Sequence, residues 1–417
     1  MDFFVRQENQ THLKSLDGIR AFSVISIIVF HVYFFALLVS ANQAMPIAFS
    51  DAMPTGLSWI RRGYLGVDIF FVLSAFLISS SLFREESKAG TIALTSFYLK
   101  RWLRIYPMYM VALLILSLLS GWSIWSLSNI LALNNITDFA HCVMPWSWSL
   151  ASEIQFYLLF PLILLFFRHP VGRLLVCALT LIASFIWMGY WYYGNSLMSS
   201  QSLVEIIVAP DRASYIYFMQ YLYISPLARM PGFIFGIVAG WIWVYRKQAL
   251  MLYVSRHRKI IVAVNIMALI GCLAIASVNP VLSKDDAGRC WQIVFDINMI
   301  FGRSLFALLT SIIMLLSIVP REKPDFMMRI LGHTLLYPIS RGSYAMYLFH
   351  PMILYGIYVA VHGTRKLEQM TLGGIALFSI TGLLGSFMVG IISYYAVEKW
   401  TSYHFLFRSR RLGKNAP

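Results

Sequence analysis

The stretch that decides the fold is Leu16–Phe35, LDGIRAFSVISIIVFHVYFF, a mostly apolar run with Arg20 near its beginning and His31 near its end. A helix that crosses a bilayer needs about 20 such residues. An ionisable side chain inside a span is costly and usually lines a pathway or a reaction site. We therefore expect His31 to be functional; the alternative is a buried, hydrogen-bonded core residue.

The composition of the whole chain indicates the same class of protein. Of the 417 residues, 59% are hydrophobic and only 12% are charged, whereas soluble domains average about 25% charged residues. The sequence predicts an all-α, polytopic membrane protein with about ten transmembrane helices in one bundle, forming a domain over 1–399 with a basic cytoplasmic tail over 400–417. The predicted spans lie near 19–39, 65–83, 105–121, 149–167, 173–193, 224–245, 260–279, 297–319, 341–361 and 373–397.

The charge is strongly positive, with 33 Lys and Arg against 18 Asp and Glu. Because the basic residues flank the spans, we expect contacts with membrane lipids and none with nucleic acid. Most of them fall in segments that share one side of the membrane, which places both termini in the cytoplasm; the pair Arg61-Arg62 is the main exception. The four cysteines lack the spacing of metal ligands, so no metal is expected.

An acidic residue lies inside the second predicted span. Asp68 is about one turn from the beginning of that span, at a depth compatible with a contact to His31. The alternatives are a helix cap or an ion pair with Arg61 or Arg62.

Two basic residues open the third predicted span. Arg101 and Arg104 in FYLKRWLRIYP (97–107) are three residues apart and so point to the same side of a helix. Two guanidinium groups at a membrane surface suit bidentate phosphate binding, with lipid head groups as the alternative ligand.

Three further segments carry polar side chains in or beside apolar runs. WSWSLASEIQFYLLFP (146–161) contains Glu153 and Gln155, and Glu153 could cap a helix, orient an imidazole or hold a sugar hydroxyl. RMPGFIFGIVAG begins with Arg229, and SYAMYLFHP contains His350. The proline after His350 frees backbone groups that a neighbour must satisfy. We expect Gln155, Arg229 and His350 to contact substrate.

Taken in order, these segments resemble membrane acyltransferase family 3 over about Ser15–Lys399. The shared motifs are R-x10-H in the first span, GVD-FFVLS-F-I in the second, R-x-x-R before Tyr-Pro in the third, WSL-x-x-E-x-Q-F-Y in the fourth and S-Y-x-x-Y-L-x-H-P late in the chain. Ala75 stands where glycine is common in the family, and Gly232 stands where an acidic residue is common, so no acidic role is expected there.

The resemblance implies acyl-CoA-dependent O-acylation, most often O-acetylation, of envelope carbohydrates such as lipopolysaccharide, other polysaccharides or glycolipids, in a bacterial cytoplasmic (inner) membrane. It implies that His31 is the essential histidine and that Arg101 and Arg104 contact coenzyme A. Acyl-CoA, such as acetyl-CoA, would be a co-substrate, with no permanently bound cofactor. Many relatives carry a fused extracytoplasmic domain, and since this chain ends at Pro417 we expect none here.

The spacing of Arg20 and His31 fits a cytoplasmic donor and an outer acceptor. Eleven residues of helix rise by roughly 16 Å, comparable to an extended pantetheine arm, so Arg20 could join the coenzyme site. His31 could act as a base whose tautomer Asp68 or Glu153 fixes, or could carry the acyl group itself. The rival hypothesis is a secondary transporter of a small anionic solute, which a discontinuous helix near Pro351 would support.

Overall fold

The computed structural model describes residues 13–121, 127–137, 142–196, 203–209, 212–278, 289–363 and 365–399, together with Phe3, Phe4, Phe139 and Met198; the predicted tail over 400–417 lies outside them. Within this part of the chain the fold is helical, and its only bridge of β type joins Ser40 and Leu367. Among the described residues, ten helices are long and apolar enough to cross a membrane. The predicted all-α architecture and its ten spans are therefore confirmed, and the protein is a multi-pass membrane protein.

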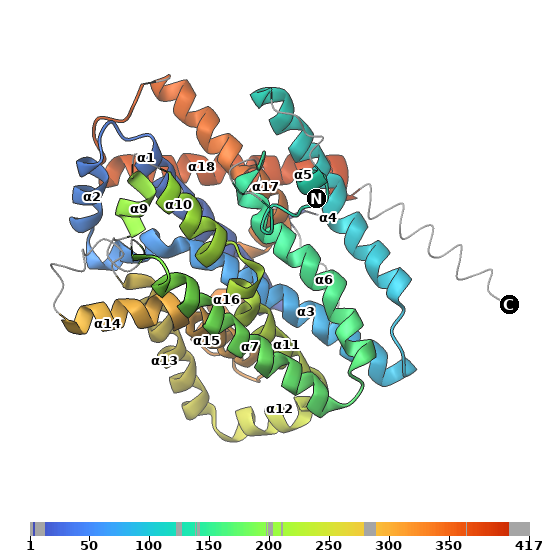
Figure 1. Ribbon diagram of the computed structural model, residues 1–417. Helices are drawn as coiled ribbons and strands as arrows, with labels where there is room; N and C mark the ends of the chain where they lie inside the picture. Colours follow the sequence, from blue (N-terminus) through green and yellow to red (C-terminus); the bar gives the residue numbers. More distant parts are fainter. Residues whose placement is uncertain are drawn as a thin grey trace.

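The spans run through the bundle of Figure 1, several of them built from two or three consecutive helical segments. In chain order the segments are α1 (Lys14–Leu38); η1 (Thr55–Leu65) with α3 (Gly66–Ala89); α4 (Leu94–Ser120); η3 (Pro145–Ser147) with α6 (Trp148–Phe166); α7 (Pro170–Tyr193); α10 (Ala213–Tyr217), η4 (Phe218–Tyr223) and α11 (Pro226–Tyr245); α13 (Arg258–Ser277); α14 (Arg289–Ile297), η5 (Asn298–Gly302) and α15 (Arg303–Ser317); α17 (Leu336–His362); and α18 (Leu372–Ser393) with η6 (Tyr394–Glu398). Shorter helices between them are α2 (Ala44–Asp51), α5 (Leu127–Ile130), α9 (Leu203–Val208), α12 (Lys247–Arg256) and α16 (Phe326–Leu331).

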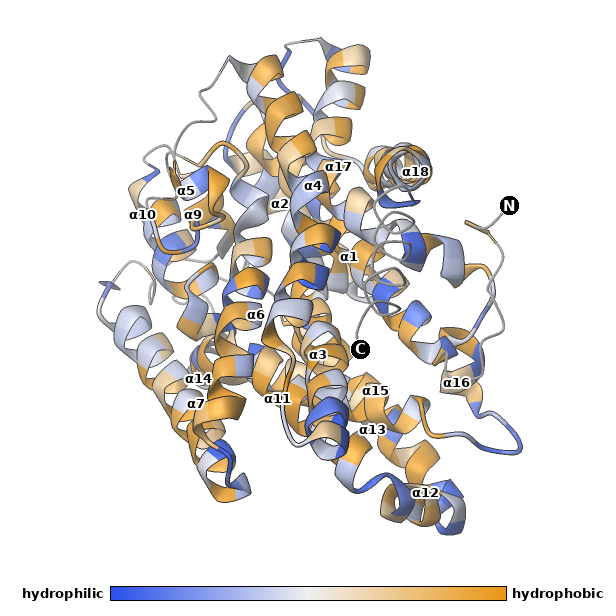
Figure 2. Cartoon of the chain, turned by 90° about the vertical axis from the view of Figure 1, so that its right-hand side faces the viewer, coloured by the Kyte–Doolittle hydropathy of each residue, from blue (hydrophilic) through white to orange (hydrophobic). Residues whose placement is uncertain are grey.

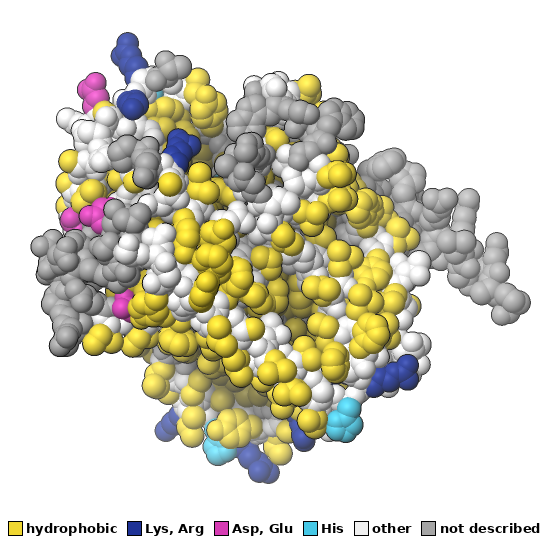
Figure 3. All heavy atoms as spheres, viewed as in Figure 1, with side chains coloured by type: hydrophobic (Ala, Val, Ile, Leu, Met, Phe, Trp, Pro, Cys, Tyr) yellow, Lys and Arg dark blue, Asp and Glu magenta, His cyan; other side chains and the backbone are white. Residues whose placement is uncertain are grey.

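The surface matches a bundle immersed in lipid. Figure 2 shows hydrophobic colours along the long helices and hydrophilic colours on many of the connecting segments. In Figure 3 apolar side chains cover the middle of the visible face, and Lys, Arg and His side chains gather at the end where α12 lies. In this arrangement the apolar surface faces lipid tails and the charged ends face water.

Segments predicted to lie on the same side of the membrane meet in the structure. At one end of α1, Ser15 Oγ donates a hydrogen bond to the carbonyl of Ser317 over 2.8 Å. Beyond the other end, Ala41 N donates to the carbonyl of Leu367 over 2.9 Å. The alternation of the spans thus agrees with the sequence; which end faces the cytoplasm remains a prediction.

Two small-residue contacts, one from η1 and one from α3, fix the register of this span against α1. Ser26 Oγ donates to the carbonyl of Gly63 over 2.9 Å, and Ser23 Oγ donates to that of Gly66 over 2.5 Å, so the helices run antiparallel. Glycine is required at this approach, since a Cβ on Gly66 would lie 2.6 Å from the carbonyl oxygen of Ser23. The same register places Asp68 about ten residues, or roughly 15 Å, along α1 from His31.

A stripe of glycines on α11 packs against α3. Gly232, Gly236 and Gly240 recur every fourth residue, the small-xxx-small pattern that lets membrane helices approach closely. A Cβ on Gly232 would lie 3.0 Å from Phe71 Cβ, and one on Gly236 would lie 2.6 Å from Ala75 Cβ. Gly232 therefore allows close packing of α11 on α3, and a larger side chain at this position would meet Phe71.

Candidate active site

A cavity of about 100 Å³ lies between α1, α3, α4, α6 and α17. The structure brings Arg20 of α1 together there with Arg101 and Arg104 of α4, the three residues predicted to bind the coenzyme. Glu153 of α6 lines the same cavity. The polar residues of its wall are Arg20, Ser74, Arg101, Arg104, Ser149, Glu153, Tyr157, Ser343, Tyr344 and Tyr347.

Positive charge exceeds negative charge in this cavity. The Glu153 carboxylate accepts hydrogen bonds from the hydroxyls of Ser74 and Tyr157. Among the residues that the structure describes, none of the three guanidinium groups has a hydrogen-bond partner, and Nε of Arg101 is buried without one. Arg20 and Arg101 are half-buried and Arg104 is exposed. Because cationic donors that are partly removed from water are normally paired, the cavity favours an anion with several oxygen atoms.

The two histidines predicted as site residues lie side by side. The ring centres of His31 (α1) and His350 (α17) are 4.6 Å apart, with the planes at 68°. His31 Nδ1 is 2.8 Å from the carbonyl oxygen of Ile27, and His350 Nδ1 is 2.7 Å from that of Tyr347. A carbonyl only accepts, so each neutral ring carries its proton on Nδ1 and a lone pair on Nε2.

Pro351 explains how His350 is held. Proline has no N–H, so the helical bond that residue 351 would donate to the carbonyl of Tyr347 is missing. The imidazole of His350 binds that free carbonyl instead. α17 nevertheless continues from Leu336 to His362 through the proline, so the discontinuous helix that would have supported a transporter is not found.

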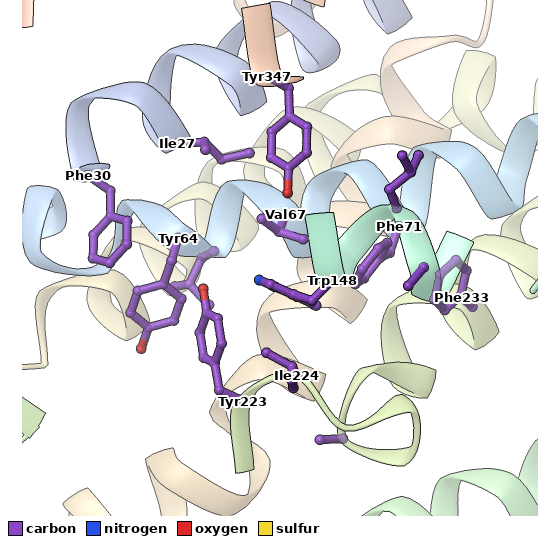
Figure 4. Packing of buried hydrophobic residues seen from close by; sticks show 14 of the residues in the cluster. Ile27, Phe30, Tyr64, Val67, Phe71, Trp148, Tyr223, Ile224, Phe233 and Tyr347 are labelled. Atoms are coloured by element: carbon purple, nitrogen blue, oxygen red, sulfur yellow. The ribbon is translucent and has the colours of Figure 1, made fainter. Parts of the chain in front are cut away.

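Tyr347 connects the cavity to the histidine pair. It lines the cavity, and its ring centre is 5.8 Å from that of His350. Its hydroxyl lies 2.5 Å from Ser149 Oγ and donates to the carbonyl of Trp146 over 2.6 Å. Figure 4 shows this hydroxyl directed at α3, near Val67. Tyr347 therefore stands between the arginine-lined space and the imidazoles.

The expectation that Asp68 or Glu153 binds His31 is wrong for this structure. Asp68 is instead paired with Arg229, whose Nη1 lies 3.1 Å from Oδ1 and 3.2 Å from Oδ2. The register of α3 on α1 separates Asp68 from the histidine. The tautomer of His31 is fixed by the carbonyl of Ile27, and the alternative pairing of Asp68 with Arg61 or Arg62 is also not observed.

Arg229 is enclosed. It is 0% exposed, and its guanidinium lies 4.6 Å from the ring centre of Trp148 and 4.3 Å from that of Tyr223. These two rings are neighbours in Figure 4. The arginine therefore ties α3, α6 and α11 together, and it does not line the cavity.

Gln155 is likewise engaged within the protein. Its amide pairs reciprocally with that of Asn135, over 2.9 and 2.7 Å. Gln155 and Arg229 lie outside the lining of the cavity, whereas His350, the third residue predicted to contact substrate, is in contact with His31. If Gln155 or Arg229 contacts substrate, the contact must occur outside this cavity.

Sequence reasoning did not single out Ser74, Tyr157, Tyr347 and Arg303. Tyr347 belongs to the motif that contains His350, and its position three residues earlier on the same helix was a usable signal. Arg303, an arginine inside a span, lies 5.3 Å from the ring centre of Tyr223. Ser74 is the serine of the motif GVD-FFVLS-F-I and Tyr157 is the last residue of WSL-x-x-E-x-Q-F-Y, so both had the same kind of signal as Tyr347.

Among the described residues that line the cavity there is no cysteine. Burial raises the pKa of the Cys142 thiol, and the hydrogen bond that it accepts from Asn134 opposes this only in part, so the thiol is not an activated nucleophile. Among the described residues there is no group of three or more His, Cys, Asp or Glu arranged to hold a metal ion.

Comparison with known proteins agrees with the motifs. A family model described as "Acyltransferase domain" matches residues 13–393. The chain is similar to "Nose resistant to fluoxetine protein 6" of Caenorhabditis elegans, 24% identical over 387 residues that cover 84% of this chain and 46% of that protein. It is also similar to "O-acetyltransferase OatA" of Staphylococcus aureus (strain NCTC 8325 / PS 47), 24% identical over 368 residues that cover 82% of this chain and 51% of that protein. The chain spans about half the length of these curated relatives, and no solved structure matches it.

Proposed function

The chain belongs to acyltransferase family 3, and from this premise we propose that it transfers an acyl group from cytoplasmic acyl-CoA to a sugar hydroxyl. The acyl group is an acetyl group in the simplest case, in keeping with the name of the relative OatA. The acceptor is an envelope polysaccharide or glycolipid, and the enzyme works in a bacterial inner membrane with both termini in the cytoplasm.

The observation that carries this proposal is the cavity lined by three guanidinium groups that have no hydrogen-bond partner among the described residues. Arg20, Arg101 and Arg104 line one space with a single carboxylate, Glu153. The phosphates of coenzyme A are polyanionic, and arginine binds phosphate through two parallel hydrogen bonds. We assign the three arginines to these phosphates, with Glu153 and its partners Ser74 and Tyr157 shaping the wall beside them.

The reacting end of the donor would then lie toward the histidines. Arg20 and His31 are eleven residues apart on one uninterrupted helix, which is roughly 16 Å of rise. A pantetheine arm of that length would pass Tyr347 and bring the thioester to the imidazole. The nucleotide could thus remain at the arginine end while the acyl group moves outward.

The geometry of His31 suits either of two chemical roles. With Nδ1–H donated to the carbonyl of Ile27, the Nε2 lone pair is free to act. It can take the proton of the acceptor hydroxyl as it attacks the thioester, or it can attack the thioester itself and hold the acyl group. The thioester is already activated, so neither role requires a cofactor.

Release of coenzyme A by the purified full chain in lipid nanodiscs tests the proposal. Acetyl-CoA and longer acyl-CoAs are supplied with envelope glycan fractions, and free coenzyme A and acylated sugar are measured by mass spectrometry. We expect release that depends on the glycan and equals the ester formed. No release with any acyl-CoA, or uptake of the intact donor into proteoliposomes without transfer, would contradict the proposal and favour a transporter.

A further inference from the structure

The second histidine has an unused lone pair. His350 is 0% exposed, its Nδ1 is bound to the carbonyl of Tyr347, and its Nε2 is buried without a hydrogen-bond partner among the described residues. An unpaired buried acceptor is destabilising, and such atoms in native proteins are few and often have a chemical role. The position of His350 against His31 suggests what that role is.

We propose that the two histidines divide the reaction between them: His31 carries the acyl group and His350 is the general base that activates the acceptor hydroxyl. This inference rests on the proposed function. It follows from the state of His31 after acylation, when Nε2 holds the acyl group and Nδ1 is already protonated and bound to the carbonyl of Ile27. His31 then has no lone pair left with which to accept a proton, so the second half of the reaction needs a different base.

The two carboxylates that the sequence offered as partners of His31 are engaged elsewhere. Asp68 is bound to Arg229, and Glu153 accepts hydrogen bonds from the hydroxyls of Ser74 and Tyr157. His350 is the neighbour whose lone pair is free and whose ring touches that of His31.

The atoms balance over two steps. In the first, His31 Nε2 forms a bond to the acyl carbon, the C–S bond breaks, and coenzyme A leaves as a thiolate. In the second, the acceptor oxygen bonds to the acyl carbon, its proton passes to His350 Nε2, and the C–N bond breaks to restore neutral His31. His350 then releases the proton to water and the thiolate takes one up from water, so that acyl-CoA and an alcohol become an ester and coenzyme A.

The distance between the rings permits this division. Because the ring centres are 4.6 Å apart, the two Nε2 atoms are at most about 7 Å apart, a span that one hydroxyl can bridge from an acyl carbon on one ring to a base within about 3 Å on the other. The carbonyl freed by Pro351 keeps the His350 ring in the required tautomer.

A single-turnover experiment separates the two half-reactions. Full-length protein in nanodiscs is mixed with excess labelled acetyl-CoA, and coenzyme A release and label on His31 are followed by rapid quench and mass spectrometry. Discharge of the label is then followed with water and with methyl β-D-glucopyranoside as hydroxyl donors. The test variant is His350→Asn, whose amide N–H can still reach the carbonyl of Tyr347 but which has no base; His350→Gln is the second variant. His362→Asn, an exposed histidine on the same helix, is the matched control.

We expect His350→Asn to acylate His31 within about twofold of the natural rate and to discharge it at least about 100-fold more slowly, the usual effect of losing a general base. The His362→Asn control should change neither step. Equal slowing of both steps in a folded variant, or normal discharge, would overturn the inference, since a merely structural role affects both halves alike. Turnover by the natural protein without label on His31 would also overturn it while leaving the proposed function standing, whereas no release of coenzyme A at all would overturn both.

Discussion

Replacing Asp68 with leucine should destabilise the bundle rather than act selectively on catalysis. The carboxylate is the ion-pair partner of Arg229, 3.1 Å away, and the two residues are 2% and 0% exposed. Without Asp68 the guanidinium keeps the rings of Trp148 and Tyr223 but no counter-charge. Breaking a buried pair by removing one partner costs about 3–5 kcal/mol, because the remaining charge stays buried and uncompensated.

Removing both charges should restore most of that loss. The cost in the single variant comes from the unpaired guanidinium, and buried pairs replaced by apolar residues of similar size are often neutral in stability. Asp68→Leu combined with Arg229→Met should therefore recover most of the free energy of unfolding lost in Asp68→Leu. The cycle of two single variants and the double variant should give a coupling of about 3 kcal/mol between these positions.

The measurement is the free energy of unfolding in mixed micelles titrated with sodium dodecyl sulfate, followed by tryptophan fluorescence. Glu322→Gln is the control, since that carboxylate is exposed and its loss should change stability by less than about 0.5 kcal/mol. If Asp68→Leu unfolds within about 1 kcal/mol of the natural protein but no longer transfers acyl groups, Asp68 has a catalytic role and not the structural role proposed for the ion pair.

His31→Gln keeps the size and hydrogen bonding of the side chain but can take neither a proton nor an acyl group. Acyl transfer should therefore fall by at least about 10²-fold while acyl-CoA binding persists; substantial turnover would show that His31 only packs in the core. Arg101→Ala or Arg104→Ala should raise the KM for acyl-CoA about tenfold or more, with Lys rescuing only in part, because a point charge lacks the two-pronged geometry; unchanged coenzyme A binding in the double Ala variant would favour lipid contacts instead. Reporter fusions at Lys88 and Asn195 should report opposite sides of the membrane, with Lys88 cytoplasmic; the same side for both would refute the ten-span topology.

The sequence by itself determined the class of fold and which three arginines line the cavity. Ten apolar runs are long enough to cross a bilayer, and length alone is sufficient because every span must satisfy its backbone internally. Arg20, Arg101 and Arg104 could be grouped in advance because each occurs near the same predicted end of its span. The sequence also predicts the effect of Pro351 on its own helix, because proline has no N–H to donate to the carbonyl one turn earlier.

Only the tertiary structure decided which side chains meet across helices. A sequence gives the depth of a residue to within a turn or so, but the partner of Asp68 depends on the axial register of α3 against α1. That register is set by Ser23 and Ser26 bonding to the carbonyls of Gly66 and Gly63, contacts with no signature in hydropathy.

The histidine pair likewise required the fold. His31 and His350 are 319 positions apart in the chain, and no periodicity relates residues on different helices. Their contact arises because α17 packs against α1, and because each ring is turned by a carbonyl of its own helix. The sequence could propose a carboxylate as the partner of His31, but helix packing placed both carboxylates with other partners and left a second imidazole beside the first.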